Sequence, residues 1–377
     1  MIYFDNASTT KINPEVLKTY EFLLREYYAN PSNSHAAALK VNNLLLKARK
    51  EIKKQLGVTK AKLIFTSGAT EANNLILFGA FGHYSSRGKK IIISKGEHSS
   101  VRNSCYHLAE RFGAEIVDIA LNSDGRVNLQ ELESALTKDT ILVSIIAVNN
   151  ETGVINDLAK ISELVRRMPH TLFHSDVTQA VGKIKLNYDL LDAFSLSSHK
   201  LHGLKGLGAL VVKKHITLTP VTFGGGQEHG FRSGTINAPA NITLSKTIRL
   251  MHENLRDETA KVTKLATRLT NYLVAHPEFY TVNSSLTNPF IVNFSLKKHK
   301  AAIIQNALSD VGIMISTTSA CSDKTNAMSP TVFAMTHDID RALNTIRVSF
   351  SIYNEISEVE LFIKTLEKLM KEVRYGN

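Results

Sequence analysis

Residues 192–200 combine groups that could hold an aldehyde cofactor. The stretch begins as an apolar, alternating run typical of a buried strand and ends in four polar residues, Ser197, Ser198, His199 and Lys200. A lysine at the polar end of a buried strand is well placed to form a Schiff base, and the hydroxyls before it could bind a cofactor phosphate. The competing interpretation is an ordinary surface lysine, because the chain holds 45 lysines and arginines.

Short strands alternate with helices around this stretch. The expected strands are residues 62–66, 90–94, 115–119, 141–148, 171–175, 192–196 and 209–212, the last returning from a tight glycine turn. The expected helices are residues 14–28, 36–56, 99–112, 128–136 and 158–168, with another beginning near Ala69. This alternation predicts an α/β fold with a mostly parallel sheet, whose ligands collect beyond the carboxyl ends of the strands.

Polar residues follow these strands and are therefore expected to converge on one edge. They are Thr70, His98, Asn149, Asp176, Gln179 and Lys200. Pyridoxal 5'-phosphate needs a lysine, a carboxylate on its ring nitrogen, donors on its phosphate and a flat group against its ring. Asp176 and His98 could supply the carboxylate and the flat group, while Asn149 and Gln179 could reach the phenolic oxygen. Each of these residues taken singly also has a structural interpretation, such as a helix cap or a surface amide.

The turn after the strand at 62–66 offers a phosphate site. There Gly68 leads directly into a helix, so the amides of Ala69 and Thr70 and the positive end of the helix dipole face outward. Glycine turns of this kind are common between strands and helices. The chain has no GxxxxGK[ST] pattern, so a nucleoside-triphosphate loop is not supported.

The remainder of the chain predicts a second, smaller domain. A helix over residues 238–275 is expected to join the two domains. Beyond it, short strands at 290–295 and 346–350 alternate with helices at about 301–311 and 355–373, which is typical of an α+β domain. The predicted organisation is an N-terminal segment (1–14) joining the small domain, a large cofactor-binding domain (15–250) and a C-terminal small domain (251–377).

The two cysteines have different surroundings. Cys105 shares one helix face with Val101, Leu108 and Phe112, which indicates an inert core residue. Cys321 lies in residues 316–326, a polar stretch without periodicity that predicts an exposed, mobile loop. An exposed thiol is a liability unless its reactivity is used, so Cys321 is a candidate functional thiol.

Composition limits the class of protein. Across 377 residues, 43% are hydrophobic and 21% charged, as in ordinary globular enzymes. No apolar run approaches the about 20 residues that span a bilayer, and the first residues do not resemble a signal peptide. Two cysteines are consistent with a reducing cytoplasm, and no metal site is expected. The net charge of +11 favours acidic partners, although it is spread along the chain rather than gathered in tracts.

Several motifs in order resemble those of the cysteine desulfurases of the NifS/IscS type, within the class V aminotransferase group of fold-type I pyridoxal-phosphate enzymes. They are residues 5–10 (DNASTT), 30–32 (NPS), 66–71 (TSGATE), 97–98 (EH), 149–153 (NNETG), 176–179 (DVTQ), 197–200 (SSHK), 232–235 (RSGT), 319–321 (SAC) and 346–347 (IR). The resemblance runs almost end to end. It implies a large domain with a mostly parallel seven-stranded sheet flanked by helices.

The resemblance also implies a role for each matching residue. Lys200 would be the Schiff-base lysine, Asp176 the partner of the ring nitrogen, and His98 the stacking residue that helps to move protons. The phosphate ligands would be Ala69, Thr70, Ser197, Ser198 and His199, with Thr235 contributed across a dimer interface. Asn149 and Gln179 would bind the ring oxygen. Arg347 would bind the substrate carboxylate, with Asn30 nearby, and Cys321 would receive sulfur.

The implied reaction is removal of sulfur from L-cysteine, which yields L-alanine and a Cys321 persulfide. A homodimer and a sulfur-acceptor protein for Fe–S cluster assembly or tRNA thiolation are expected, without direct nucleic-acid or membrane binding. Relatives often have Arg at the position of His229, so its role stays open. A class V aminotransferase or selenocysteine lyase is the alternative on the same scaffold. A non-enzymatic sulfur carrier or RNA-associated protein is the alternative from another class, suggested by the net charge.

Overall fold

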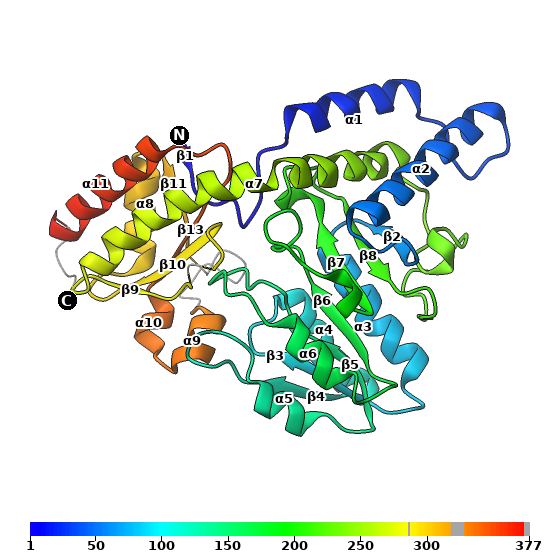
Figure 1. Cartoon of the computed structure of the whole chain (residues 1–377), viewed down its shortest axis with the longest axis horizontal. Helices are drawn as coiled ribbons and strands as arrows, with labels where there is room; N and C mark the ends of the chain where they lie inside the picture. Colours follow the sequence, from blue (N-terminus) through cyan, green and yellow to red (C-terminus); the bar gives the residue numbers. More distant parts are fainter. Residues whose placement is uncertain (286, 318–327, 373–377) are drawn as a thin grey trace.

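A seven-stranded sheet forms the centre of the larger part of the molecule, as seen in the computed structural model, which describes residues 1–285, 287–317 and 328–372 (Figure 1). Its strands follow the order β2 (Lys62–Thr66), β8 (Gly208–Val212), β7 (Ala193–Ser197), β6 (Leu172–Asp176), β5 (Thr140–Ser144), β3 (Lys90–Ser94) and β4 (Glu115–Ile119). Only β8 runs antiparallel to its neighbours in this sheet. The mostly parallel seven-stranded sheet is therefore confirmed.

Helices cover both faces of this sheet. One face packs against α2 (Ala36–Gln55), α5 (Leu129–Ala135), α6 (Leu158–Val165) and the first half of α7 (Ala238–Ala275). The other face packs against α3 (Ala69–Tyr84) and α4 (Ser99–Phe112). Successive residues of β3 alternate between the two cores, since Ile92 belongs to the first and Ile91 and Ile93 to the second. Burial on both faces explains why the strands are nearly continuous apolar runs.

The strand expected over residues 141–148 is shorter than predicted. It ends at Ser144, and its ladder is interrupted because the backbone N–H of Ile146 donates to the carboxyl group of Glu97 over 2.8 Å. The carbonyl of Ile146 accepts from Asn156 Nδ2 instead of from a strand. Two buried polar side chains thus replace the strand partner on one edge, while Ile145 and Ala147 still donate to the carbonyls of His174 and Asp176 in β6 on the other. An apolar run cannot reveal that exchange.

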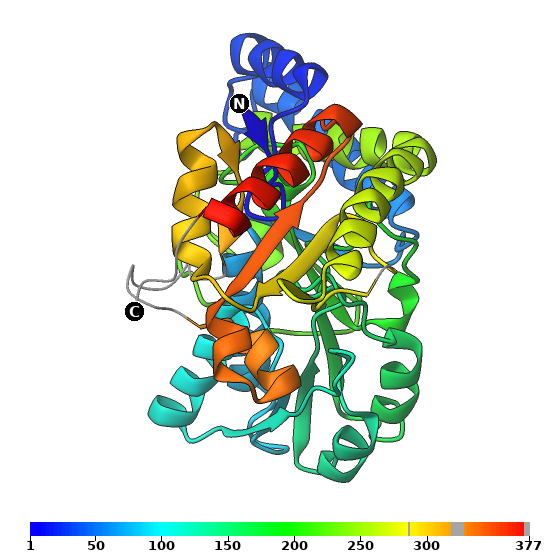
Figure 2. The ribbon, with the colours of Figure 1, turned by 90° about the vertical axis from the view of Figure 1, so that its left-hand side faces the viewer.

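The smaller part of the molecule is built on an antiparallel sheet (Figure 2). Its order is β12 (Ser316–Thr317), β13 (Thr345–Ser349), β10 (Ile291–Leu296) and β9 (Tyr280–Val282). The core beside it also includes residues from α8 (Ala301–Asp310), α11 (Ile356–Glu372) and the second half of α7. The short helices α9 (Pro330–Thr336) and α10 (Ile339–Leu343) lie between β12 and β13 in the chain.

The N-terminal segment returns to the smaller part before the chain enters α1 (Pro14–Glu26). Its first strand, β1 (Ile2–Tyr3), pairs in parallel with β11 (Ile313–Met314), and Phe4 packs into the same core. Asn13 caps α1 as expected, because its side chain accepts from the N–H of Glu15. The segment therefore links the two parts of the molecule a second time, in addition to α7.

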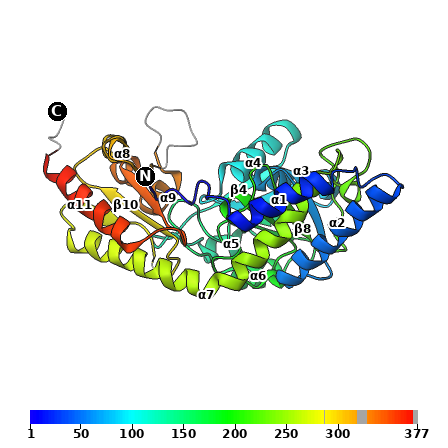
Figure 3. The same cartoon turned by 90° about the horizontal axis from the view of Figure 1, so that it is seen from above.

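Helix α7 runs along both parts of the molecule (Figure 3). Its observed bounds coincide with the predicted 238–275, and its 38 residues include Leu244 in the core of the large sheet and Leu269 in the core of the small one. Among the described residues, neither this helix nor any other has an apolar stretch that could cross a membrane. One rigid element thus sets the distance between the two cores.

Candidate active site

Three predicted site residues meet at the carboxyl edge of the large sheet. Asp176 is the last residue of β6, which pairs with β7. The end of β7 leads into a one-turn 3-10 helix, Ser198–Lys200. His98 caps the helix that follows β3. The charges of Lys200 and Asp176 both act on His98, so the three side chains share one site.

Asp176 is buried, with 5% of its surface exposed, yet its carboxyl group is held in the ionised form. Its Oδ2 accepts from Asn73 Nδ2 over 2.9 Å and its Oδ1 from the backbone N–H of Thr178 over 3.0 Å. Burial alone would raise the pKa of Asp176, but the hydrogen bonds from Asn73 and Thr178 outweigh it and lower the pKa. The site therefore contains a fixed negative charge.

The same amide of Asn73 connects Asp176 to His98. Its second hydrogen goes to Ser100 Oγ over 2.9 Å, and Ser100 Oγ lies 2.8 Å from His98 Nδ1. The backbone N–H of Ser100 also donates to His98 Nδ1, so this nitrogen carries no proton. Burial lowers the pKa of His98, and the Lys200 ammonium lowers it further. The neutral ring therefore has its proton on Nε2.

The start of α3 offers donors for an anion. Gly68 caps this 16-residue helix without any side-chain hydrogen bond, which leaves the amides of Ala69 and Thr70 outside the helical ladder. At Gly208 of β8 a Cβ atom would lie 2.6 Å from Gly68 Cα, so the backbone of β8 presses against this turn. Ser198 Oγ is buried and has no hydrogen-bond partner among the described residues.

His199 has a half-buried, neutral ring in the 3-10 turn that carries Lys200. Burial lowers its pKa to about 4, and the positive charge of Lys200 acts in the same direction. Its Nδ1 lies 3.1 Å from Thr9 Oγ1, and its backbone carbonyl accepts from Thr10. The N-terminal segment therefore fixes the orientation of the 3-10 turn that carries Lys200.

Gln179 is held at both ends of its amide. Its Nε2 donates to the carbonyl of Ala7 over 2.9 Å, and its Oε1 accepts from Lys183 Nζ over 2.8 Å. Because the backbone carbonyl of Ala7 can only accept, that contact sets which end of the amide is the NH₂ group. One hydrogen of Nε2 is left for another acceptor, such as a ring oxygen.

Asn149 is more constrained than Gln179. Its Nδ2 donates to the carbonyl of Gly96 and to Thr331 Oγ1, and its Oδ1 accepts from the backbone N–H groups of Glu151 and Thr152. Both amide hydrogens are therefore already used in the protein. A bond from Asn149 to a ring oxygen would require the release of one of them, whereas Gln179 needs no such change.

Arg347 projects from β13 of the smaller sheet towards the same edge. Its Nη2 contacts Asp5 Oδ1 over 2.9 Å and Ser8 Oγ over 2.6 Å, and its Nη1 donates to the carbonyl of Asn150. Its Nε has no hydrogen-bond partner among the described residues, although the side chain is buried. Arg347 thus joins the two parts of the molecule at the site.

Asn30 is not brought to Arg347 within one chain. It belongs to the connection between α1 and α2, which lies at the opposite end of the molecule from β13 (Figures 1 and 3). Its Oδ1 accepts from the N–H of Ser32, so in this chain it shapes its own turn. Thr235 is exposed in the loop before α7, and Cys321 lies outside the described residues.

Cys105 has the surroundings expected of a core residue. It is fully buried in α4, in the same cluster as Val101 and Leu108. Burial raises its pKa, so the thiol stays protonated and unreactive.

Comparison with known proteins identifies the family. The class-V aminotransferase family matches residues 2–362. The cysteine desulfurase IscS of Proteus mirabilis is 36% identical over 99% of this chain and 93% of its own length. A NifS/IcsS protein homolog of Lactobacillus delbrueckii subsp. bulgaricus is 36% identical over 98% and 97%. The chain belongs to the class-V aminotransferase family.

Solved structures agree with this assignment. A NifS-like protein superposes with a TM-score of 0.92 at 32% identity, covering 99% of this chain and all of its own. Class-V aminotransferases depend on pyridoxal 5'-phosphate, and the residues present fit that group. The ionised Asp176 suits a protonated ring nitrogen, and the unpartnered Ser198 hydroxyl and the uncapped start of α3 suit a phosphate.

Two residues of this class-V site were missed from the sequence. The amide of Asn73 donates one hydrogen to Asp176 and the other to Ser100, which contacts His98, and Lys183 donates to Gln179. The sequence does show Asn73 in the helix that begins after Gly68, and Lys183 one helical turn after Gln179. An asparagine in a helix and a lysine are, however, far more often on the surface than in a buried site. Only the finding that both are buried reveals their contacts.

The link through Asn73 predicts the effect of removing its amide. In Asn73→Leu, Asp176 loses a donor and its pKa rises, so cofactor retention fails first at acid pH. A hydrogen bond to a charged group contributes about 1.5–3 kcal/mol, so the affinity for pyridoxal phosphate should fall about tenfold or more. Equilibrium dialysis across pH measures it. Asn74→Leu is the control, since the neighbouring amide of Asn74 contacts the Thr70 carbonyl and Ser104 and does not reach Asp176; equal loss in both would refute the link.

The burial of Lys183 predicts that the free energy of unfolding depends on pH. Burial lowers its pKa to about 7, the charges of Lys200 and Arg347 add to this, and Glu258 opposes it. The folded state therefore binds fewer protons than the unfolded state between pH about 7 and the ordinary lysine value, so stability rises with pH there.

The variant Lys183→Met, which removes the titrating ammonium group, tests this prediction. The stability of wild type relative to this variant should rise from pH 7 to 9 by at most about 1.4 kcal/mol per pH unit, measured by denaturant unfolding of cofactor-free protein. Lys185→Met, which alters an exposed lysine, should show no such slope. A flat difference for Lys183→Met would show that its ammonium is not buried as described.

Proposed function

We propose that this chain is a cysteine desulfurase that converts L-cysteine to L-alanine and places the sulfur on Cys321 as a persulfide. The observation that carries the proposal is the meeting of Lys200, an ionised Asp176 and Arg347 at one sheet edge. When bound, pyridoxal phosphate withdraws electrons from the Cα atom of the substrate. Similarity to cysteine desulfurases supports L-cysteine as the substrate.

The residues of the large sheet hold the cofactor and move the proton. Lys200 would hold the cofactor covalently, and its amine, when free, would take the Cα proton of the substrate. Asp176 would keep the ring nitrogen protonated, and the neutral ring of His98 would stack on the cofactor and relay protons through Nε2. Gln179 would donate to the ring oxygen, and Asn149 would assist after releasing one of the two bonds of its amide. The phosphate ligands are Ala69, Thr70, Ser197, Ser198 and His199.

Arg347 and Cys321 determine which reaction follows. The guanidinium of Arg347, steadied by Asp5 and Ser8, pairs with the substrate carboxylate. Asn30 would have to come from a partner subunit to assist it. The thiolate of Cys321 attacks the substrate sulfur, so an S–S bond forms as the substrate C–S bond breaks, and the carbon left behind takes a proton to give alanine.

The persulfide is passed to an acceptor protein, in Fe–S cluster assembly or in tRNA thiolation, and the proposed location is the cytoplasm. Glu151 connects the site to the chain beyond the Cys321 segment. Its carboxyl group accepts from Ser329 and Thr331 at the start of α9, and Thr331 contacts Asn149. The start of α9, which follows Cys321 in the chain, is thus held beside Asn149 by Glu151.

Two substitutions test the proposal separately. Cys321→Ser should abolish sulfide release from L-cysteine while it retains the visible absorbance of bound cofactor. Lys200→Ala should lose covalent attachment, measured as cofactor trapped by borohydride, and should slow the reaction by about 100-fold or more. Cys105→Ala is the control for loss of a thiol. Sulfide release at the wild-type rate by Cys321→Ser would overturn the persulfide role.

A mixed dimer tests whether Thr235 of the partner subunit binds the phosphate. Thr235→Asp places a negative charge beside the phosphate and should remove cofactor from the homodimer. When it is paired with a Lys200→Ala chain, one site contains both intact residues, so about half the wild-type activity and cofactor per dimer should return. No recovery in the mixed dimer would place Thr235 in the same subunit as Lys200, and a Thr235→Asp homodimer that keeps its cofactor would place Thr235 outside the site.

A further inference from the structure

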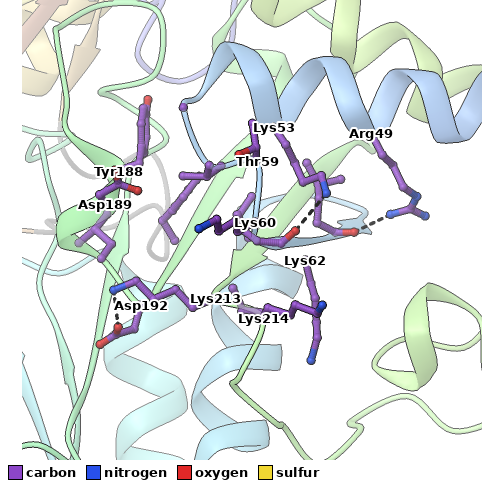
Figure 4. Close-up of a pocket in the computed structure, with 18 of the residues that line it drawn as sticks. Arg49, Lys53, Thr59, Lys60, Lys62, Tyr188, Asp189, Asp192, Lys213 and Lys214 are labelled. Atoms are coloured by element: carbon purple, nitrogen blue, oxygen red, sulfur yellow. Dashed lines mark hydrogen bonds and ion pairs between the residues drawn. The ribbon is translucent and has the colours of Figure 1, made fainter.

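A groove of about 1490 Å³ lies at the edge of the large sheet opposite Lys200 (Figure 4). It is bounded by α2, by residues 57–63 leading into β2, by residues 188–194 leading into β7, and by residues 211–215 at the end of β8. Because β8 is antiparallel, these are the amino ends of β2 and β7 and the carboxyl end of β8. The catalytic residues follow the other ends of β2 and β7.

The lining is strongly basic. Seven lysine and arginine side chains face two aspartates, a formal excess of five positive charges. Two of the cations are neutralised: Arg49 pairs with Glu228, and Lys213 pairs with Asp192 over 2.8 Å. Two others, Lys53 and Lys62, donate to backbone carbonyls.

Three exposed lysines in the groove have no such contact. Lys50 extends from α2, Lys60 from the turn before β2, and Lys214 from the chain after β8. None makes an ion pair or hydrogen bond with any other residue that the structure describes. In Figure 4, Lys60 and Lys214 lie across the groove from Tyr188 and Asp189. Unpaired cations gathered from three separate elements form a site for negative charge.

The floor of the groove is apolar, which restricts the kind of anion. Its lining includes Leu46, with 53% of its surface exposed, and the buried Val58 and Leu191. Its two aromatic residues, Tyr188 and Phe194, are only 7% and 2% exposed, so they offer no face for stacking a base. The volume also exceeds the about 300–1,000 Å³ typical of small-molecule pockets.

We propose that this groove docks an acidic segment of a partner protein, whose carboxylates meet Lys50, Lys60 and Lys214 and whose apolar side chain packs on Leu46. An acidic polypeptide with an apolar anchor matches both the charge and the floor, whereas a nucleic-acid backbone matches only the charge. The inference does not depend on the desulfurase activity, because no residue of the groove lies at the cofactor edge. A partner held here leaves that edge open.

The test uses the cofactor-loaded protein and a fluorescent synthetic peptide of glutamates with two leucines, followed by anisotropy. Lys50→Glu, Lys60→Glu and Lys214→Glu combined should weaken binding by about tenfold or more, and Leu46→Ser by about threefold or more. The control combines Lys264→Glu, Lys300→Glu and Lys364→Glu, three exposed lysines of the smaller part, and should change binding less than about twofold. Sulfide production should be equal in all.

Each other outcome contradicts the proposal. Equal weakening by both triple variants would mean that net charge, not the groove, attracts the peptide. Tighter binding of a single-stranded RNA oligonucleotide, lost in the groove variant, would replace the protein partner with nucleic acid. Insensitivity to Leu46→Ser would remove the apolar anchor. No binding of either probe at low salt, where such attraction is strongest, would leave the groove without an anionic ligand.

Discussion

A buried carboxylate stays ionised only where several donors converge on it, and the site depends on how Asp176 meets that condition. Asn73 comes from α3 and Thr178 from the chain after β6, so two elements must be in register to supply the two bonds. The other hydrogen of Asn73 reaches Ser100 at the start of α4, which sets the ring of His98. One charge therefore places the starts of two helices, and with them the proposed phosphate and stacking groups.

Positive charge is concentrated around this carboxylate. Lys200 and Arg347 are near enough to Lys183 to lower its pKa together with burial. The chain offsets part of that repulsion itself, because Asp5 pairs with Arg347 and Glu258 acts on Lys183. A phosphate, a ring oxygen and a substrate carboxylate are all anionic, so the same excess of cations suits the proposed cofactor and substrate. Closely spaced cations would destabilise a site with no anionic function.

Much of this arrangement could be predicted from the sequence, because the strands are apolar runs and their carboxyl ends carry the polar residues. The bounds of α7 and the return of β8 from a glycine turn followed from periodicity and turn composition. The sequence could not show which polar side chains already use all their hydrogens within the protein. Asn149 was expected to bind a ring oxygen, but both hydrogens of its amide are donated to Gly96 and Thr331. Residues distant in sequence decide such contacts, and no local pattern encodes them.

The basic groove likewise could not be predicted from the distribution of charge along the sequence. Along the sequence the excess of cations is spread without tracts, which argues only weakly for any partner. Folding brings together Lys50, Lys60 and Lys214 because the turn before β2 and the end of the antiparallel β8 lie side by side next to α2. Had β8 run parallel, Lys214 would lie at the catalytic edge. The reversal of one strand therefore separates two clusters of cations. One lies at the catalytic edge and suits small anions, and the other lies at the opposite edge and suits the proposed partner.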